Sequence, residues 1–160
     1  MPVAIGRCGI QIVLADSRSK GKAAEYYPAL GGGDDRRDAF RHIFASVILR
    51  RYCTEWGALL VTNANEWLAN NSYAAHQMDY HNNTVGRVAK YNHFRGHWFW
   101  DRWGWKTWGQ RVRSYIDAPG GTSGTFANGV YFQAWANGAP NSQVDSELNL
   151  VEGWKYVYFQ

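Results

Sequence analysis

Two short segments of this 160-residue chain gather polar side chains that could act as acids, bases or ligands. The first is residues 38–42 (Asp-Ala-Phe-Arg-His), and the second is residues 78–83 (Met-Asp-Tyr-His-Asn-Asn), which Gly86 and Arg87 follow. Both segments otherwise have the composition of a buried helix, and burial of such groups is costly unless each is paired, hydrogen-bonded or bound to a ligand. The two segments are therefore candidate parts of one active site.

In the first segment, Asp38 and His42 are four residues apart, so a helix places them on one face with Arg41 beside them. An aspartate that orients a histidine is a common general-base arrangement, and the same pair could bind a metal ion. The alternative is a salt bridge on the helix surface, with Asp38 near the positive N-terminus of the helix. Taken alone, the segment leaves both interpretations open.

The second segment is denser, with five candidates within nine residues: Asp79, His81, Asn82, Asn83 and Arg87. Carboxylate and amide oxygens suit hard cations such as Ca²⁺ or Mg²⁺, and a histidine could join them or act as a base. The two asparagine amides and Arg87 could stabilise negative charge on a phosphate or carboxylate. The alternative is helix capping by Asp79 or Asn82, which the density of polar groups disfavours.

Glu66 and an aromatic stretch are weaker candidates. Glu66 lies among apolar residues and could be a metal ligand, although a glutamate that faces solvent would fit equally well. His97, Trp98 and Trp100 open a stretch that contains five of the nine tryptophans. Such aromatic side chains could contact a sugar or lipid substrate, or they could belong to the core.

Charge and composition narrow the function classes. The net charge of +4 favours anionic partners, namely nucleic acid, phospholipid or a cell-wall precursor. The basic residues are scattered, so no nucleic-acid-binding tail is indicated, and no apolar run approaches the roughly 18 residues that a membrane span needs. The motifs of serine hydrolases, P-loop enzymes, dinucleotide-binding enzymes and zinc proteases are absent. Cys8 and Cys53 could form one disulfide or remain free thiols.

The periodicity of apolar residues predicts a mainly α (α+β) single domain over residues 1–160, with about four helices and a small C-terminal β element. Within it we expect a helical, site-bearing core, a Trp-rich segment and a β-rich end, over residues 34–92, 94–116 and 125–160. The predicted helices and strands cover residues 36–52, 56–69, 74–91, 107–116, 129–135 and 154–159. The N-terminal 15 residues are expected to form a short strand or buried segment, followed by a polar linker over residues 16–22 and a capping turn over residues 31–35.

Residues 38–42, 62–66 and 78–87 resemble, in order and approximate spacing, three motifs of a bacterial domain family found in secreted proteins and polymorphic toxins. Those motifs are an Asp-Ala-Phe-Arg-His helix, an Ala-His-Glu segment and a Met-Asp-Leu-His-Asn-Asn-x-x-Gly-Arg segment. The resemblance covers about residues 34–92 and implies a helical domain whose polar motifs converge on one site. It departs from the family at Asn65, where the pattern has histidine, so this chain would have altered that part of the site.

Carried over motif by motif, the resemblance implies these site residues: Asp38, Arg41, His42, Glu66, Asp79, His81, Asn82, Asn83 and Arg87. A looser similarity of residue types relates the chain to lipid II-cleaving colicin M-type toxins, which use Asp, Asn, His and Arg on a phosphoester. With such a family we expect secretion, or delivery to the periplasm or cell envelope of a target bacterium, and the chain could be the C-terminal piece of a larger secreted protein. An immunity protein is then a candidate partner.

The sequence hypothesis is a toxin-type hydrolase that acts on a phosphate-containing substrate, an envelope lipid or a cell-wall precursor. Asp79, with Asp38 or Glu66, would hold a divalent cation, and His42 or His81 would activate water. The arginines and asparagines of the two segments would stabilise the phosphoryl oxygens. Two alternatives remain open at this point, a non-catalytic module that binds cell wall or membrane and a metal-dependent nuclease.

Overall fold

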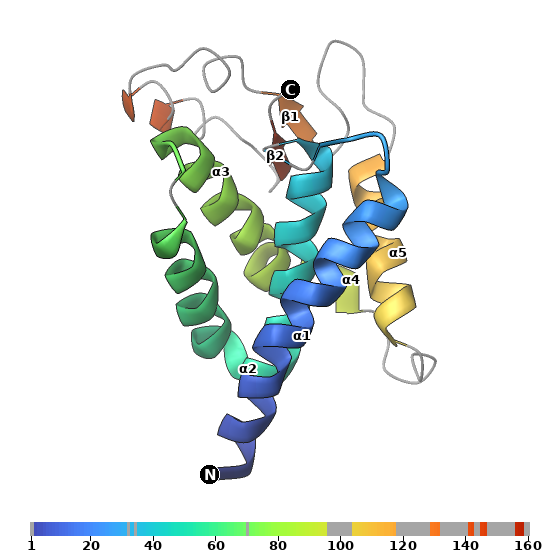
Figure 1. Cartoon of the computed structure of the whole chain (residues 1–160), viewed down its shortest axis with the longest axis vertical. Helices are drawn as coiled ribbons and strands as arrows, with labels where there is room; N and C mark the ends of the chain where they lie inside the picture. Colours follow the sequence, from blue (N-terminus) through green and yellow to red (C-terminus); the bar gives the residue numbers. More distant parts are fainter. Residues whose placement is uncertain are drawn as a thin grey trace.

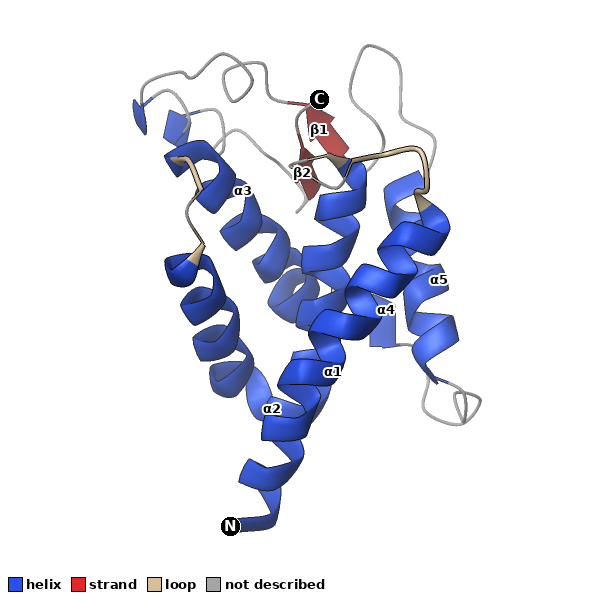
Figure 2. Ribbon diagram, in the orientation of Figure 1, coloured by secondary structure: helices blue, strands red, loops and turns tan. Residues whose placement is uncertain are grey.

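The computed structural model shows a mainly helical protein with one small pair of strands (Figures 1 and 2). It describes residues 2–31, 33, 35–69, 71–95, 104–117, 129–131, 141–142, 145–146 and 156–158. In chain order the elements are α1 (Pro2–Tyr26), α2 (Arg36–Leu68), α3 (Tyr73–Thr84), the π-helix η1 (Val85–Ala89), α4 (Tyr91–Arg95), α5 (Gly104–Asp117), β1 (Gly129–Tyr131) and β2 (Tyr156–Tyr158). The predicted fold class is confirmed. No helix in these ranges combines the length and the apolarity needed to cross a membrane.

The N-terminal segment is a long helix, so the prediction of a short strand followed by a polar linker was wrong. α1 packs on α2 and buries Ala15, Ser19 and Ala23, whereas Ile10 and Val13 on the same helix are exposed. Because the buried stripe consists of small residues and the large apolar side chains face outward, the segment lacks the apolar periodicity by which helices are recognised.

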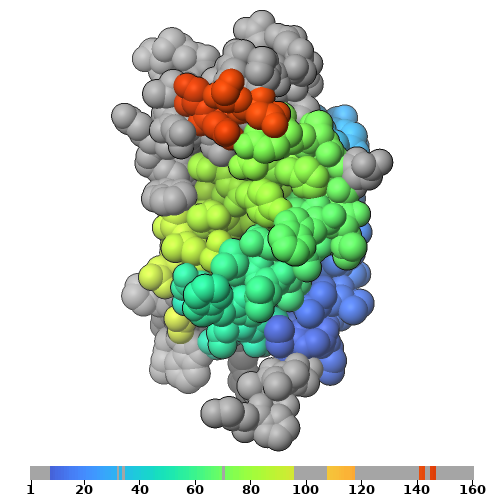
Figure 3. Space-filling model, turned by 90° about the vertical axis from the view of Figure 1, so that its left-hand side faces the viewer, coloured from blue at the N-terminus to red at the C-terminus, as the bar shows by residue number. Residues whose placement is uncertain are grey.

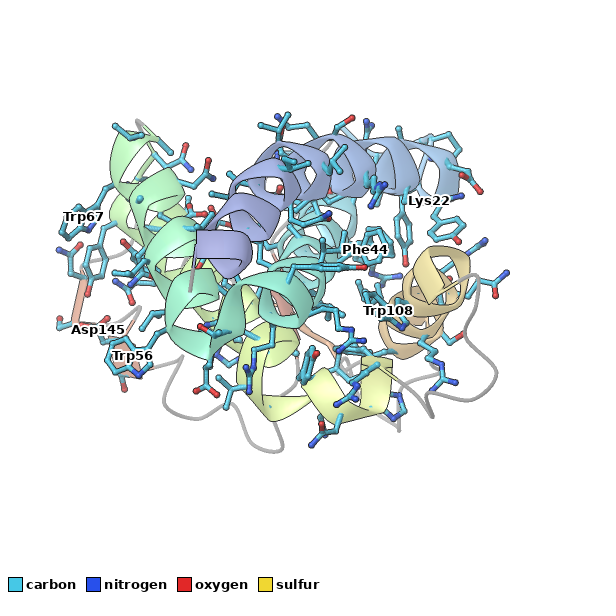
Figure 4. The ribbon with its side chains drawn as sticks, turned by 90° about the horizontal axis from the view of Figure 1, so that it is seen from below. Lys22, Phe44, Trp56, Trp67, Trp108 and Asp145 are labelled. Atoms are coloured by element: carbon cyan, nitrogen blue, oxygen red, sulfur yellow. A yellow bond between two sulfur atoms is a disulfide. The ribbon has the colours of Figure 1, made fainter. Side chains whose placement is uncertain are left out.

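The first half of α2 is the centre of the fold, with α1, α3, η1 and α5 packed around it. Its most buried apolar side chains are Phe40, Ile43, Phe44, Val47 and Ile48. Phe44 lies between α1 and α5 in Figure 4, on the side of the molecule where Trp108 also packs. As predicted, the turn before the helix ends in a cap, since the carboxylate of Asp35 accepts hydrogen bonds from the amides of Arg37 and Asp38.

α2 changes direction at Thr54, and this kink creates two arms, the first over residues 36–53 and the second over residues 55–68. Thr54 has φ 61° and ψ 173°, which a β-branched residue rarely adopts, and its hydroxyl accepts a hydrogen bond from the Gly57 amide. The two arms correspond to the two predicted helices. In Figure 1, the second arm and α1 lie close together near the kink and move apart toward the top of the view.

A disulfide between Cys8 and Cys53 joins α1 to α2 next to the kink. It decides between the two alternatives that the sequence left open. We expect Cys8→Ser to lower the free energy of unfolding by about 3–4 kcal/mol, because the bond closes a loop of 45 residues and restricts the unfolded chain. Urea unfolding with and without a thiol reductant measures the effect. The reductant should destabilise the wild type and leave the variant unchanged; an equal response of both proteins would contradict the prediction.

α3 begins after Ser72, whose hydroxyl accepts a hydrogen bond from the Ala75 amide, and it continues directly into η1. The sequence predicted one uninterrupted helix here, with Val88 on its buried face. The wider turn of a π-helix shifts the register of the side chains that follow. This shift accounts for the 45 % exposure of Val88, whereas Met78 and Val85 are fully buried as predicted.

The C-terminal part is described only in pieces. α5 contains the predicted helix 107–116, and β1 and β2 pair in parallel, with Val130 opposite Val157. The other residues of the predicted strands lie outside the described residues. Near the start of α3, the Tyr73 hydroxyl donates to Asp145, and the residues on either side of this contact are adjacent on the surface in Figure 3.

Candidate active site

Two helices bring polar side chains together at four-residue spacing, and all of these side chains are buried. The first arm of α2 contributes Asp38, His42 and Ser46, the second arm contributes Thr62 and Glu66, and α3 contributes Asp79 and Asn83. Residues four apart lie on one face of a helix, so the three helical segments each present a polar stripe within an otherwise apolar interior. The two motif segments therefore meet in the structure, as predicted, and Glu66 lies with them.

His42 stands at the centre of this group. Its Nε2 lies 3.0 Å from Asp79 Oδ1 and 3.6 Å from Asp38 Oδ1, and its Nδ1 lies 3.5 Å from Glu66 Oε1. Asp38 is 3 % exposed, and Glu66 and Asp79 are each 1 % exposed. The surface salt bridge proposed as the alternative for Asp38, and the solvent-facing alternative for Glu66, are therefore wrong. Asp79 lies well inside α3, so it is no helix cap either.

The ligand atoms of Asp38, His42 and Asp79 all lie within 4.8 Å of one another, so this buried group could hold a metal ion. Glu66 faces the other ring nitrogen of His42, which is the arrangement that commonly orients a metal-binding imidazole. Among the described residues, the three buried carboxyl groups face one guanidinium, that of Arg41, so two negative charges would lack a paired cation there if all three were ionised. A divalent cation would balance that charge.

The protonation states of His42 and Asp79 follow from their burial. Burial and the charge of Arg41 lower the pKa of His42 to about 3, against the opposing effect of a hydrogen bond with Asn83, so the imidazole is neutral at pH 7. Burial and the negative charges of Asp38 and Glu66 raise the pKa of Asp79 far above its usual range. Without a cation, Asp79 therefore keeps its proton. Cation binding would require that proton to leave.

Arg41 and Asn83 border the buried group and carry hydrogen-bond donors. Arg41 forms an ion pair with Asp38, and its Nη2 donates to His42 Nε2 at 2.9 Å. Asn83 Oδ1 accepts a hydrogen bond from the Ser46 hydroxyl, while its Nδ2 is buried with no acceptor among the described residues. Asn83 Nδ2 can therefore donate to a ligand that approaches His42, and Arg41 has further N–H groups besides the Nη2 group that contacts Asp38 and His42.

Two pockets meet at Arg41 and Lys20, which line both of them. The inner pocket, about 170 Å³, lies between α1 and the two arms of α2 and is lined by Ile12, Ala15, Asp16, Ser19, Lys20, Arg41, His42, Ala45, Leu49, Val61, Thr62, Asn65, Glu66 and Asn83. The basic pocket, about 270 Å³, lies where α1, the turn after it and the start of α2 meet, and is lined by Lys20, Ala23, Gly31, Arg37, Asp38 and Arg41. The buried group is thus accessible from two sides.

Several predicted site residues lie elsewhere. Arg87 is buried, and the charges that act on it are those of Glu55 and Arg50 near the kink of α2. His81 is half-buried and Asn82 is fully buried, and neither lines a described pocket. Residues two apart on a helix point in different directions, which is why His81 does not accompany Asp79.

The aromatic stretch and Asn65 are the remaining parts of the predicted site. The substrate-binding candidates His97, Trp98 and Trp100 lie outside the described residues. Trp108, from the same aromatic stretch, is a core residue whose indole N–H donates to the Arg95 carbonyl at 3.0 Å. Asn65, at the position where the resembled family has histidine, lines the inner pocket next to Glu66.

Four residues of the site were not predicted: Lys20, Arg37, Ser46 and Thr62. Two of them had a signal in the sequence, because Ser46 follows His42 by four residues and Thr62 precedes Glu66 by four. Lys20 had none, since its segment was interpreted as a linker.

Comparison with known proteins gives one match. A family model described as a domain of unknown function (DUF6973) matches residues 8–97, which include every residue of the buried group. Neither the curated proteins nor the solved structures yielded a match to this chain. Because the matched region spans more than half of the 160 residues, the chain belongs to the family of domains of unknown function described as DUF6973.

Proposed function

We propose that this protein is a metal-assisted hydrolase of the bacterial toxin type, which cleaves a phosphoester in a cell-envelope lipid or peptidoglycan precursor. The observation that supports the proposal most is the buried group of Asp38, His42 and Asp79, which lies beside Arg41 where the two pockets meet. A cation-binding group next to a guanidinium is the combination that phosphoryl transfer requires.

In this proposal Asp38, His42 and Asp79 hold a divalent cation, whose charge would stabilise negative charge on the phosphoryl oxygens. The carboxylates suit Mg²⁺ or Ca²⁺, and the imidazole also accommodates Mn²⁺ or Zn²⁺. Arg41 binds the phosphoryl group. Glu66 orients His42 through Nδ1, and because it also lines the inner pocket, its carboxylate can accept a proton from a water molecule there.

The composition of the inner pocket favours a substrate with a hydrocarbon part. Ile12, Leu49 and Val61 give the inner pocket an apolar part of its lining, beside the polar side chains of the buried group. Ile12 is partly exposed in this part of the lining, and Ile10 and Val13 on the same helix are exposed as well. A nucleic-acid strand would instead favour a groove of regularly spaced cations and stacking aromatics. Among the described lining residues of the inner pocket, Lys20 and Arg41 are the cations, which favours a lipid phosphate.

The resemblance to secreted and toxin-type domains adds the proposed setting, which is secretion or delivery to the envelope of a target bacterium, with an immunity protein as a candidate partner. The disulfide fits that setting, because disulfides persist in the periplasm and are rare in the cytosol.

Expression in bacteria, with the chain sent either to the cytoplasm or to the periplasm, tests the proposal. We expect growth arrest from the periplasm, and we expect His42→Ala to abolish it because that substitution removes the centre of the buried group. His93→Ala is the matched control, since His93 is exposed on α4 and lines no described pocket. Arrest from the cytoplasm would instead favour the nuclease alternative.

A purified-protein assay separates the remaining alternatives. Cleavage of a lipid phosphate ester should require Mg²⁺ or Ca²⁺ and stop on addition of a chelator. Degradation of plasmid DNA or total RNA under the same conditions would point to the nuclease. Binding to lipid vesicles or cell wall by a folded protein that cleaves none of these would leave the non-catalytic module as the better account.

A further inference from the structure

The basic pocket has a chemistry that the proposed reaction at His42 leaves unused. Lys20, Arg37 and Arg41 supply three positive charges to it, and Asp38 is the one acidic residue among its described lining residues. Asp38 is buried and already faces both Arg41 and His42. The pocket therefore presents a net positive lining of a size that accommodates a phosphate group.

Lys20 and Arg37, which line the basic pocket together with Arg41, both keep N–H groups that a ligand could use. Lys20 is exposed and pairs with Asp16 at 2.8 Å, an exposed pair of the kind that contributes little to stability and is readily exchanged. Arg37 is half-buried, and its Nη1 donates to the Leu30 carbonyl at 2.6 Å. That bond fixes the side chain but uses one of the five N–H groups of a guanidinium.

Arg41 connects this pocket to the proposed reaction centre. Its guanidinium lines both pockets and contacts Asp38 and His42 directly. Two phosphoryl groups that share a bridging oxygen are close enough for one guanidinium to contact both, because its N–H groups spread over a planar fork. If one phosphoryl group of such a ligand binds at His42, the second phosphoryl group would therefore lie at the entrance of the basic pocket.

We propose that the basic pocket binds a second phosphoryl group of the same ligand, so that the protein recognises a diphosphate rather than a single phosphate. This inference rests on the proposed function, which places the first phosphoryl group at Arg41 and His42. The basic pocket then receives the outer phosphoryl group, and the inner pocket, with its partly apolar lining, receives the substituent on the other side. Arg37 and Lys20 determine this selectivity and take no part in the chemistry.

The test compares inorganic pyrophosphate with inorganic phosphate, each titrated calorimetrically into the protein in the presence of Mg²⁺. We expect the wild type to bind pyrophosphate at least about tenfold more tightly, since a further pair of charge-assisted hydrogen bonds is worth a factor of this order. Arg37→Gln should reduce the affinity ratio of the two anions to near one. Arg51→Gln is the matched control, because Arg51 is exposed on the same helix, lines neither pocket and carries the same charge.

Because Arg37→Gln also removes the bond to Leu30, Lys20→Gln provides a second variant with an exposed side chain that should lower the same ratio. Equal affinity of the wild type for the two anions, or an equal loss in Arg51→Gln, would overturn the proposal. If pyrophosphate binds in an Arg37-dependent way but no phosphoester is cleaved, the proposed function fails and the pocket assignment stands. If the wild type and Arg37→Gln cleave monophosphate and diphosphate esters equally well, the proposed function stands and the assignment of the basic pocket fails.

Discussion

Asp79→Asn is expected to lower hydrolysis at least about a thousandfold and, at the same time, to stabilise the cation-free protein. Activity falls because the amide removes one charged ligand from the group of three, and each factor of ten corresponds to about 1.4 kcal/mol of lost transition-state stabilisation. Stability rises because the amide resembles the protonated acid that the buried site favours. At pH 7.5 the gain should be up to about 5 kcal/mol, since that pH lies nearly four units above the unfolded pKa of 3.8 and each pKa unit is worth about 1.4 kcal/mol.

The same argument predicts a pH dependence. The pKa of Asp79 is raised in the folded protein, so above about pH 4, where the unfolded chain releases that proton, the free energy of unfolding falls as the pH rises. His42, with its pKa lowered to about 3, acts in the opposite direction, but only below the ordinary histidine pKa of 6.5. Between pH 7 and pH 9 the raised pKa of Asp79 is the shift that acts among the described residues, and wild-type stability should decrease by up to about 1.4 kcal/mol per pH unit.

Urea unfolding with chelator, at pH 7, 8 and 9, measures this for the wild type and Asp79→Asn. The variant should show a flat profile, and Mg²⁺ should raise the stability of the wild type far more than that of the variant. A wild-type profile as flat as that of Asp79→Asn would mean that Asp79 is ionised in the folded protein, and the account of the buried group would be wrong. Asp117→Asn, an exposed carboxyl on α5, is the control.

Gly86→Ala is expected to destabilise the protein by about 3 kcal/mol, the upper end of what overpacking costs. A Cβ at this position would lie 2.3 Å from the carbonyl oxygen of Ile43 and 3.0 Å from its Cα. These are backbone atoms of the first arm of α2, so they cannot rotate away as a side chain would. η1 must then move away from α2 and take α3, with Asp79, along with it. Loss of activity should therefore accompany the loss of stability.

Gly21→Ala is the matched control for this substitution. Gly21 lies within α1, and a Cβ there would meet nothing within 4 Å. Alanine is a better helix former than glycine, so the control should stabilise the protein by up to about 1 kcal/mol. Thermal or urea unfolding compares the two variants directly. Destabilisation of both by similar amounts would show that the close approach at Gly86 is not the cause.

The site was predictable to the extent that it depends on helix geometry. Asp38 and His42, four residues apart in a helix with clear apolar periodicity, had to share a face, and the structure places them so. The meeting of α2 with α3 was expected from the resemblance and is present in the contact of His42 with Asp79. Whether Glu66 faced inward could not be decided from the sequence, because the direction of the second arm depends on the kink at Thr54.

The predictions for α1 and Arg87 were wrong for reasons that also concern helix geometry. α1 was not recognised because small side chains make its contact with α2. Arg87 was grouped with Asp79 because both belong to one dense polar segment, over which one uninterrupted helix was predicted. The π-turn that begins at Val85 changes the register of that helix, and no local property of the residues indicates where such a turn starts.

The buried charged groups and the residues that border the pocket in front of them come from different parts of the chain. The buried acid and imidazole groups belong to α2 and α3, whereas Ile12 and Lys20, which border the space in front of them, belong to a helix that ends before the first motif begins. Chains that share the motifs but differ in this helix would keep the same chemistry and admit different molecules. Ligand preference can therefore diverge within the family through substitutions in α1, without any change to the buried charges.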